Sequence, residues 1–166
     1  MEKDLLLLKT QQLLDLWKDF CQKHTELYDL TCEEYLHLLS SEIENLELTI
    51  ASKEELIKFI NGLDELRTDL ILDISKDLNL SPKTSFKNLL NALSENGLES
   101  QSEQIQKMNY ILLDIIEKIQ LQNKKNQIFL NKALLSLNEL KASFTGDKNY
   151  KTYSSTGGMA SSRTTY

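Results

Sequence analysis

The chain has 166 residues, enough for one domain with a hydrophobic core, and a formal net charge of −6. It holds one proline, five glycines and no valine, while Leu, Lys, Glu, Gln and Asn dominate. This composition disfavours sheet and predicts an all-α protein. The apolar run Leu5 to Leu8 follows acidic residues and is far shorter than the roughly 18 residues of a membrane helix, so neither a transmembrane helix nor a secretory signal is expected.

Charge is distributed unevenly along the chain. Residues 1–100 carry 10 Lys/Arg against 20 Asp/Glu, whereas residues 141–166 carry 4 against 1. An acidic body argues against nucleic acid as a partner. The basic end has two interpretations: it is simply solvated, or it folds back on the body or steers an acidic partner.

The first helix is predicted to run from residue 3 to about residue 49, because apolar residues recur there at helical spacing. Thr31-x-x-Glu34 matches a capping box, so a break near Thr31 is the alternative. Ser52-x-x-Glu55 is the stronger match, since a new apolar stripe follows it. A second helix is therefore expected to start there and to end near Asn79.

The next segment carries the signals of a short helix. Ser81-Pro82 stops the chain, because the residue before proline avoids helical geometry. Thr84 or Ser85 is expected to cap a helix whose apolar residues are Phe86, Leu89, Leu90 and Leu93. Asn96-Gly97 predicts a turn, and Ser100-x-x-Glu103 predicts the start of the last helix.

The last helix is expected to span residues 101–145, roughly 65 Å at about 1.5 Å per residue. Such a helix either packs along partner helices or protrudes. Its apolar stripe turns polar at Gln122, Asn123 and Asn126, which either set helix register or face solvent, or form a hydrogen-bonding patch for a partner. The stripe consists of Ile105, Met108, Leu112, Ile115, Ile116, Ile119, Leu130, Ala133, Leu134, Leu137, Leu140 and Phe144.

Composition changes after Gly146. Residues 152–166 include eight Ser/Thr and two Gly, too little apolar surface to offset the entropy of ordering. We expect a helical domain over residues 1–146 and a flexible tail over 147–166.

Residues typical of catalysis are sparse. Cys21 and Cys32 are expected to be reduced and partly buried, and we find no metal-ligand spacing. His24 and His37 lack nucleophile partners, and His37 lacks the Lys-Gly context of a phosphotransfer site. The sequence predicts no enzyme, no cofactor and no metal.

The end of the chain carries a recognisable pattern. Asn123-x-x-Asn126-x-x-x-Leu130-x-x-x-Leu134, followed by Leu140, Gly146 and Tyr153-x-x-x-Gly157, resembles the C-terminal signature of the FlgN family of flagellar type III export chaperones. Two further segments agree, a helical one from Lys53 that ends in Arg67, and a loop with a short helix over residues 78–90. The stretch from Glu42 to Lys53 is shorter than is usual in that family.

The resemblance and the periodicity together predict the fold: an all-α, elongated antiparallel helical bundle with long N- and C-terminal helices, a short extra helix and a disordered C-terminal tail. The resemblance implies a cytoplasmic chaperone. It would bind the C-terminal helical segments of hook–filament junction (hook-associated) proteins, prevent premature assembly and deliver them to the flagellar export gate. The substrate-binding residues would be Asn123, Asn126, Leu130, Leu134, Leu137, Leu140 and Phe144.

The tail aromatics have two interpretations. Tyr150 and Tyr153 are either idle or anchor the chain to the cytoplasmic domain of the export gate, and the family pattern favours Tyr153. From a different functional class, the alternative is a structural coiled-coil or tether protein without a secretion client. Self-association of the free chain stays open at this point.

Overall fold

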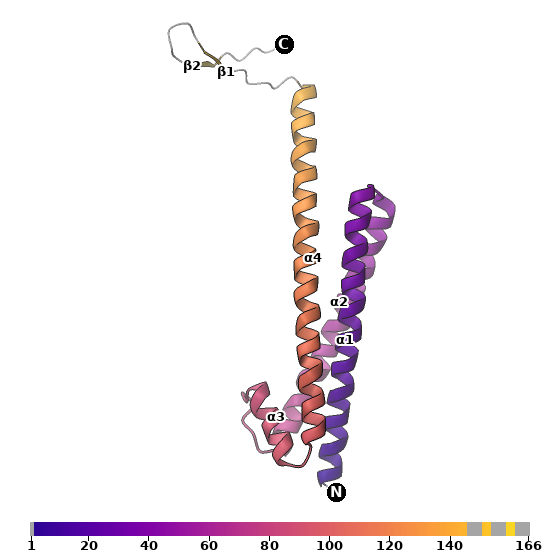
Figure 1. Cartoon of the computed structure of the whole chain (residues 1–166), viewed down its shortest axis with the longest axis vertical. Helices are drawn as coiled ribbons and strands as arrows, with labels where there is room; N and C mark the ends of the chain where they lie inside the picture. The colour runs from indigo at the N-terminus through magenta and orange to yellow at the C-terminus, as the bar shows by residue number, and fades with distance from the viewer. Residues whose placement is uncertain (1, 146–150, 154–158, 162–166) are drawn as a thin grey trace. The chain divides into compact units, whose positions relative to one another are not determined.

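The computed structural model describes residues 2–145, 151–153 and 159–161, and Figure 1 shows the chain coloured from its N-terminus to its C-terminus. The chain divides into two compact units, Met1–Asn126 and Gln127–Tyr166, and the last helix contributes to both. The elements are α1 (Glu2–Ser40), α2 (Ile43–Asp77), α3 (Phe86–Glu95), α4 (Glu99–Thr145), β1 (Lys151–Tyr153) and β2 (Met159–Ser161).

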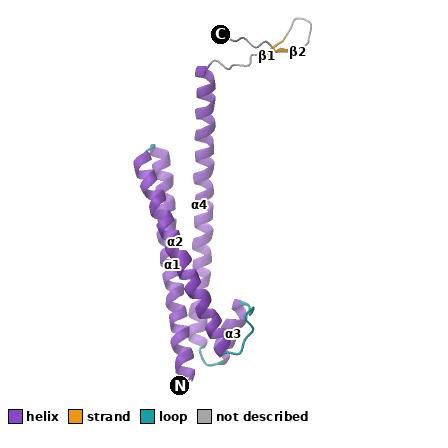
Figure 2. Cartoon of the chain, turned by 180° about the vertical axis from the view of Figure 1, so that it is seen from behind, coloured by secondary structure: helices purple, strands orange, loops and turns teal. Residues whose placement is uncertain are grey.

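The first unit is a helical bundle in which α1 and α2 lie side by side and antiparallel (Figure 2). Lys9 of α1 pairs with Asp77 of α2 at 2.6 Å, and Lys53 of α2 pairs with Glu34 near the other end of α1. The part of α4 in this unit runs parallel to α1. Two contacts fix that direction: Cys21 Sγ donates to the main-chain oxygen of Met108 at 3.4 Å, and Asn126 bonds to the main chain of Thr31. The predicted all-α bundle is thus confirmed.

The core of this unit is built from the predicted stripes, because helical spacing gathers their apolar side chains on one face of each helix. The short helix α3 closes one end of the bundle with its buried leucines, and Trp17 meets Phe86 edge to face at 5.5 Å. The buried apolar residues are Leu6, Leu13, Leu14, Trp17, Phe20, Leu27, Ile60, Leu63, Ile74, Leu89, Leu90, Leu93, Leu98, Ile105, Leu112 and Ile119.

The prediction of one helix over residues 3–49 is wrong, because α1 ends at Ser40. Ser41 has φ 59°, in the left-handed region, and the Glu42 N–H donates to the His37 carbonyl at 3.1 Å. This six-to-one bond caps the carbonyl end of the helix, as in a Schellman motif. Glycine is the usual residue at such a position, and its absence hides the turn from sequence reasoning.

Both expected capping boxes are wrong for a common reason. Thr31 lies inside α1 and Ser52 inside α2. The hydroxyl of Thr31 donates to the Leu27 carbonyl at 2.7 Å, and that of Ser52 donates to the Leu48 carbonyl at 3.0 Å. A hydroxyl that bonds back four residues is accommodated within a helix, so the pattern alone does not mark a helix start.

Later boundaries agree with the prediction. Asn79, with φ 53°, follows the end of α2, and Gly97, with φ 86°, follows α3. The Ser85 hydroxyl accepts from the Asn88 N–H at 3.3 Å and caps α3. The last helix begins at Glu99, slightly before the expected Ser100.

The second unit contains the rest of α4, from Gln127 onward, and a two-stranded hairpin. β1 pairs antiparallel with β2, with Thr152 opposite Ala160. The sequence predicts no secondary structure in this tail, so these six residues differ from the expectation. The division between the units also differs from the one expected at Gly146, because it follows the end of packing at Asn126 rather than the change in composition.

Gly62 is not a site of close helix approach, contrary to our expectation. A Cβ placed on it would meet nothing within 4 Å, and the residue is exposed. Its α-helical backbone therefore gains nothing from the lack of a side chain.

We predict that Gly62→Ala stabilises the protein by about 1 kcal/mol, because alanine has the higher helix propensity and orders less entropy on folding. Urea denaturation followed by circular dichroism measures this. The exposed Ala51 in the same helix supplies the reverse control, since Ala51→Gly should destabilise by a similar amount. A lower midpoint for Gly62→Ala would show that α2 needs the glycine.

Candidate partner-binding site on α4

The site is best described from the point at which α4 stops packing. Its stripe is buried at Ile105, Leu112 and Ile119, and the last buried residue of the stripe is polar. That residue, Asn126, is 3% exposed. Its amide nitrogen donates to the Thr31 carbonyl at 2.9 Å, and its amide oxygen accepts from Gln122 at 3.0 Å.

A second polar contact lies beside the first. Lys53 of α2 donates to the amide oxygen of Asn123 at 3.2 Å while it also pairs with Glu34 of α1. Polar side chains of one α4 turn are therefore bonded to both helices of the α1–α2 pair. Buried polar groups with matched partners tolerate only one alignment of the helices, so this turn fixes the register of α4.

Past this turn the same stripe is exposed. Leu130, Leu134 and Leu140 are each about half exposed, Leu137 is 62% exposed and Phe144 is 87% exposed. These residues continue the 3- and 4-residue steps of the buried stripe, so they project from the face that is core in the first unit. An apolar stripe of this length in water is typical of a surface that binds a partner.

The exposed segment also carries apolar residues that the stripe does not include. Ile128 and Leu135 are exposed and lie on the other side of the helix. The sequence prediction omitted them because it followed a single stripe. The signal that could have found them is the seven-residue spacing of Leu121, Ile128 and Leu135.

Arg67 serves the fold. Its guanidinium lies over the rings of Trp17 and Phe20, at 5.2 and 5.4 Å from their centroids, and pairs with Asp64 at 2.5 Å. A guanidinium stacked on aromatic faces packs the α1–α2 interface while its charge stays paired. The Arg67 Nε and the Trp17 indole N–H are buried without a partner, so the cluster is held by stacking and burial rather than by hydrogen bonds.

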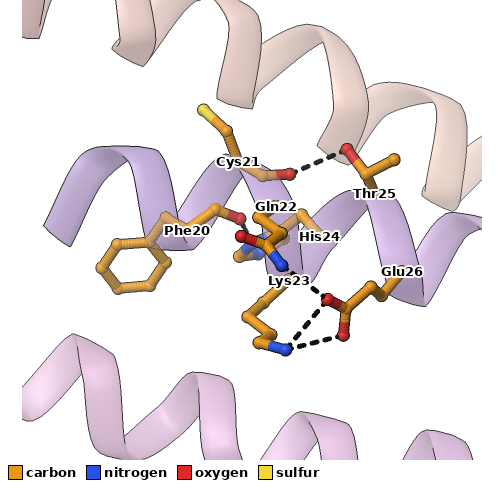
Figure 3. Close-up of polar contacts among 7 residues, drawn as sticks. All are labelled: Phe20, Cys21, Gln22, Lys23, His24, Thr25 and Glu26. Atoms are coloured by element: carbon orange, nitrogen blue, oxygen red, sulfur yellow. Dashed lines mark hydrogen bonds and ion pairs between the residues drawn. The ribbon is translucent and has the colours of Figure 1, made fainter. Parts of the chain in front are cut away.

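The histidines and cysteines have structural roles. Figure 3 shows that the His24 ring lies beside the Phe20 carbonyl, where Nδ1 donates at 2.8 Å. His37 Nδ1 contacts a Glu42 carboxylate oxygen at 3.1 Å at the α1–α2 turn. Both cysteines are free, and burial raises the pKa of the Cys21 thiol, which keeps it protonated. Neither histidine is arranged with a nucleophile.

Within the described residues, no group of three or more His, Cys, Asp or Glu is placed to hold a metal ion. Over the same part of the chain, no helix combines the length and apolar character needed to cross a membrane. Of the two tail tyrosines, Tyr153 is the last residue of β1, opposite Met159, while Tyr150 lies outside the described residues.

Comparison with known proteins settles the family. The model of the FlgN protein family matches residues 1–161, nearly the whole chain. The chain belongs to the FlgN family. No significant match is found among curated proteins or among solved structures. The FlgN family is one of flagellar export chaperones, so this chain is a chaperone of that class rather than an enzyme.

We predict that Asn126→Ala lowers the free energy of unfolding by about 1–2 kcal/mol, because it removes a buried hydrogen bond and leaves Gln122 without its acceptor. Asn131→Ala is the matched control, since Asn131 is exposed on the same helix. That change should stay within about 0.5 kcal/mol. Urea denaturation of both variants gives the comparison, and equal stabilities would remove Asn126 from its role in register.

Proposed function

We propose that this FlgN-family chain is a cytoplasmic chaperone whose exposed α4 stripe binds the C-terminal helical segments of flagellar hook-associated proteins. The observation that carries the proposal is the continuation of one apolar stripe from the buried to the exposed part of α4. Leu130, Leu134, Leu137, Leu140 and Phe144 leave the core face without a partner in the chain's first unit.

The physical basis is the packing of one helix on another. An amphipathic client helix would remove these leucines from water, and each fully buried leucine contributes roughly 1.5–3 kcal/mol. Asn123 is exposed at the start of the stripe and can still meet the client. Asn126 is buried, so it acts by positioning α4 rather than by touching the client in the free chaperone.

Covering the client's terminal helices gives a simple chaperone mechanism. Junction proteins assemble through such helices, and a helix held on α4 cannot assemble prematurely. Binding of this kind needs burial and helix packing alone, so no cofactor is required. The acidic first hundred residues disfavour nucleic acid as the partner.

Delivery to the export gate is proposed for the tail. Tyr150 and Tyr153 are flanked by Lys148 and Lys151, which would speed encounter with an acidic surface of the gate's cytoplasmic domain. A tyrosine ring in a pocket supplies a large contact area at low entropic cost. We assign the main contact to Tyr153.

A structural coiled-coil protein remains the alternative in another class. Its stripe would be satisfied by stable self-association, whereas a client-binding chaperone leaves the stripe available. Sedimentation of the purified chain with and without a hook-associated protein separates the two.

We predict that Leu134→Ser/Leu137→Ser weakens binding of the hook-associated client at least about 30-fold, because two apolar anchors become polar. Isothermal titration measures the affinity. Leu36→Ser/Leu48→Ser is the matched control, since both leucines are similarly exposed but lie in α1 and α2. If the α4 variant bound like the wild type, the client would have to dock elsewhere.

We predict that Tyr153→Ala lowers affinity for the isolated cytoplasmic domain of the gate by about 1–2 kcal/mol, as for a modest hot spot. Client affinity should hardly change, because the client lies along α4. Tyr150→Ala is the neighbouring control. Loss of client binding by Tyr153→Ala would instead place that residue in the client site, and unchanged affinity for both partners would refute the anchor.

A further inference from the structure

The exposed part of α4 has two apolar faces, and the proposed stripe is only one of them. Three pairs of residues are nine positions apart: Leu121 and Leu130, Ile128 and Leu137, and Leu135 and Phe144. Nine residues make about two and a half turns, so the members of each pair lie on opposite sides of the helix. All six side chains are exposed.

Either face alone would be ordinary, but both together are not. A helix that is apolar on opposite sides is usually buried on both, because a single neighbouring helix covers only one stripe. Ile128 is 46% exposed and Leu135 is 62% exposed, values close to those of the stripe leucines. We call Ile128 and Leu135, with Leu121 before them at the same spacing, the outer face.

The two faces differ in their charged neighbours. Lys124, Lys125 and Lys132 are exposed beside the outer face, and Glu139 is the single acidic residue between positions 123 and 144. The stripe is bordered mainly by uncharged residues such as Asn131, Asn138 and Ser143. The outer face therefore suits a partner helix with acidic borders, whereas the stripe suits a helix that binds chiefly through apolar contact.

We infer that the exposed segment of α4 is clamped by two helices of the same client: one on the stripe, and an acidic-bordered one on the outer face. This inference rests on the proposed function and specifies the form of its partner. Charge complementarity selects the occupant, because the α4 helix of a second chaperone copy would bring lysines against lysines. A client with two adjacent terminal helices reaches both sides of one helix through a short connection.

The test compares double variants of the full-length chaperone by titration with a purified full-length hook-associated protein. Ile128→Ser/Leu135→Ser should weaken binding at least about tenfold, and Leu36→Ser/Leu48→Ser should leave it within about twofold. If Leu134→Ser/Leu137→Ser also has no effect, the proposed function fails. If that stripe variant binds weakly while the outer-face variant binds normally, only the two-helix inference fails.

Charge gives an independent measurement. Lys124→Glu/Lys132→Glu should weaken binding about fivefold at low salt, and the effect should shrink at about 0.5 M salt, where screening is strong. Lys83→Glu/Lys87→Glu makes the same change of net charge on exposed residues away from α4 and controls for long-range steering. Equal effects of the two pairs would remove the acidic border from the proposal.

Photo-crosslinking identifies the occupant even if a variant folds poorly. Leu135→p-benzoylphenylalanine and Leu137→p-benzoylphenylalanine place probes on the outer face and on the stripe. We expect both to crosslink the same client at different peptides. Crosslinks from position 135 to a second chaperone copy, to the same client peptide as position 137, or to nothing would each overturn the inference.

Discussion

The hydrogen bond from the Asn126 amide to the Thr31 carbonyl determines where α4 is part of the core. It joins the last buried position of the α4 stripe to the main chain of α1, across 95 residues of sequence. A buried amide without a partner costs free energy, so this pairing holds in one register of the two helices. Above and below this contact the same sequence period serves different purposes. Ile119 and the residues before it fill the core, while Leu130 and those after it face water.

The rest of the first unit holds α1 against α2 firmly enough for that contact to form. At one end Trp17, Phe20 and Phe86 pack with Arg67, so α3 is fastened to the α1–α2 pair by aromatic contacts. Toward the other end Lys53 links α2 to α1 and to Asn123. The bundle thus combines an apolar end with a polar one. This arrangement supports the exposed segment without involving it in folding, which is what a binding helix requires.

Much of this could be predicted from the sequence, because helical periodicity and helix ends have local causes. The apolar stripes, the Ser85 cap and the turns at Asn79 and Gly97 follow from residue types that few other conformations favour. The end of α1 could not be predicted, because Ser41 adopts a left-handed conformation for which its side chain gives no signal. Ser52 misled for a related reason, since its hydroxyl is satisfied within the helix.

The candidate site was predictable only in part. The stripe from Leu130 to Phe144 was visible as a period, but its exposure depends on where α1 and α2 lie, which no local pattern gives. Asn126 illustrates the difficulty: an asparagine on an apolar stripe fits a register contact and a partner contact equally well. Its burial against Thr31 decides between them for the free chain. The outer face was missed because its three apolar residues are a full heptad apart and no single helical turn reveals them.

The position of the single tryptophan has a practical consequence for spectroscopy. Trp17 is 3% exposed, enclosed by Phe86 of α3 and by Arg67, all within the first unit. Its emission reports whether the aromatic end of the bundle is intact and is insensitive to what occupies residues 127–144. A fluorescence spectrum recorded on the same sample as a binding isotherm therefore distinguishes a chaperone that has lost its partner from one that has lost its fold.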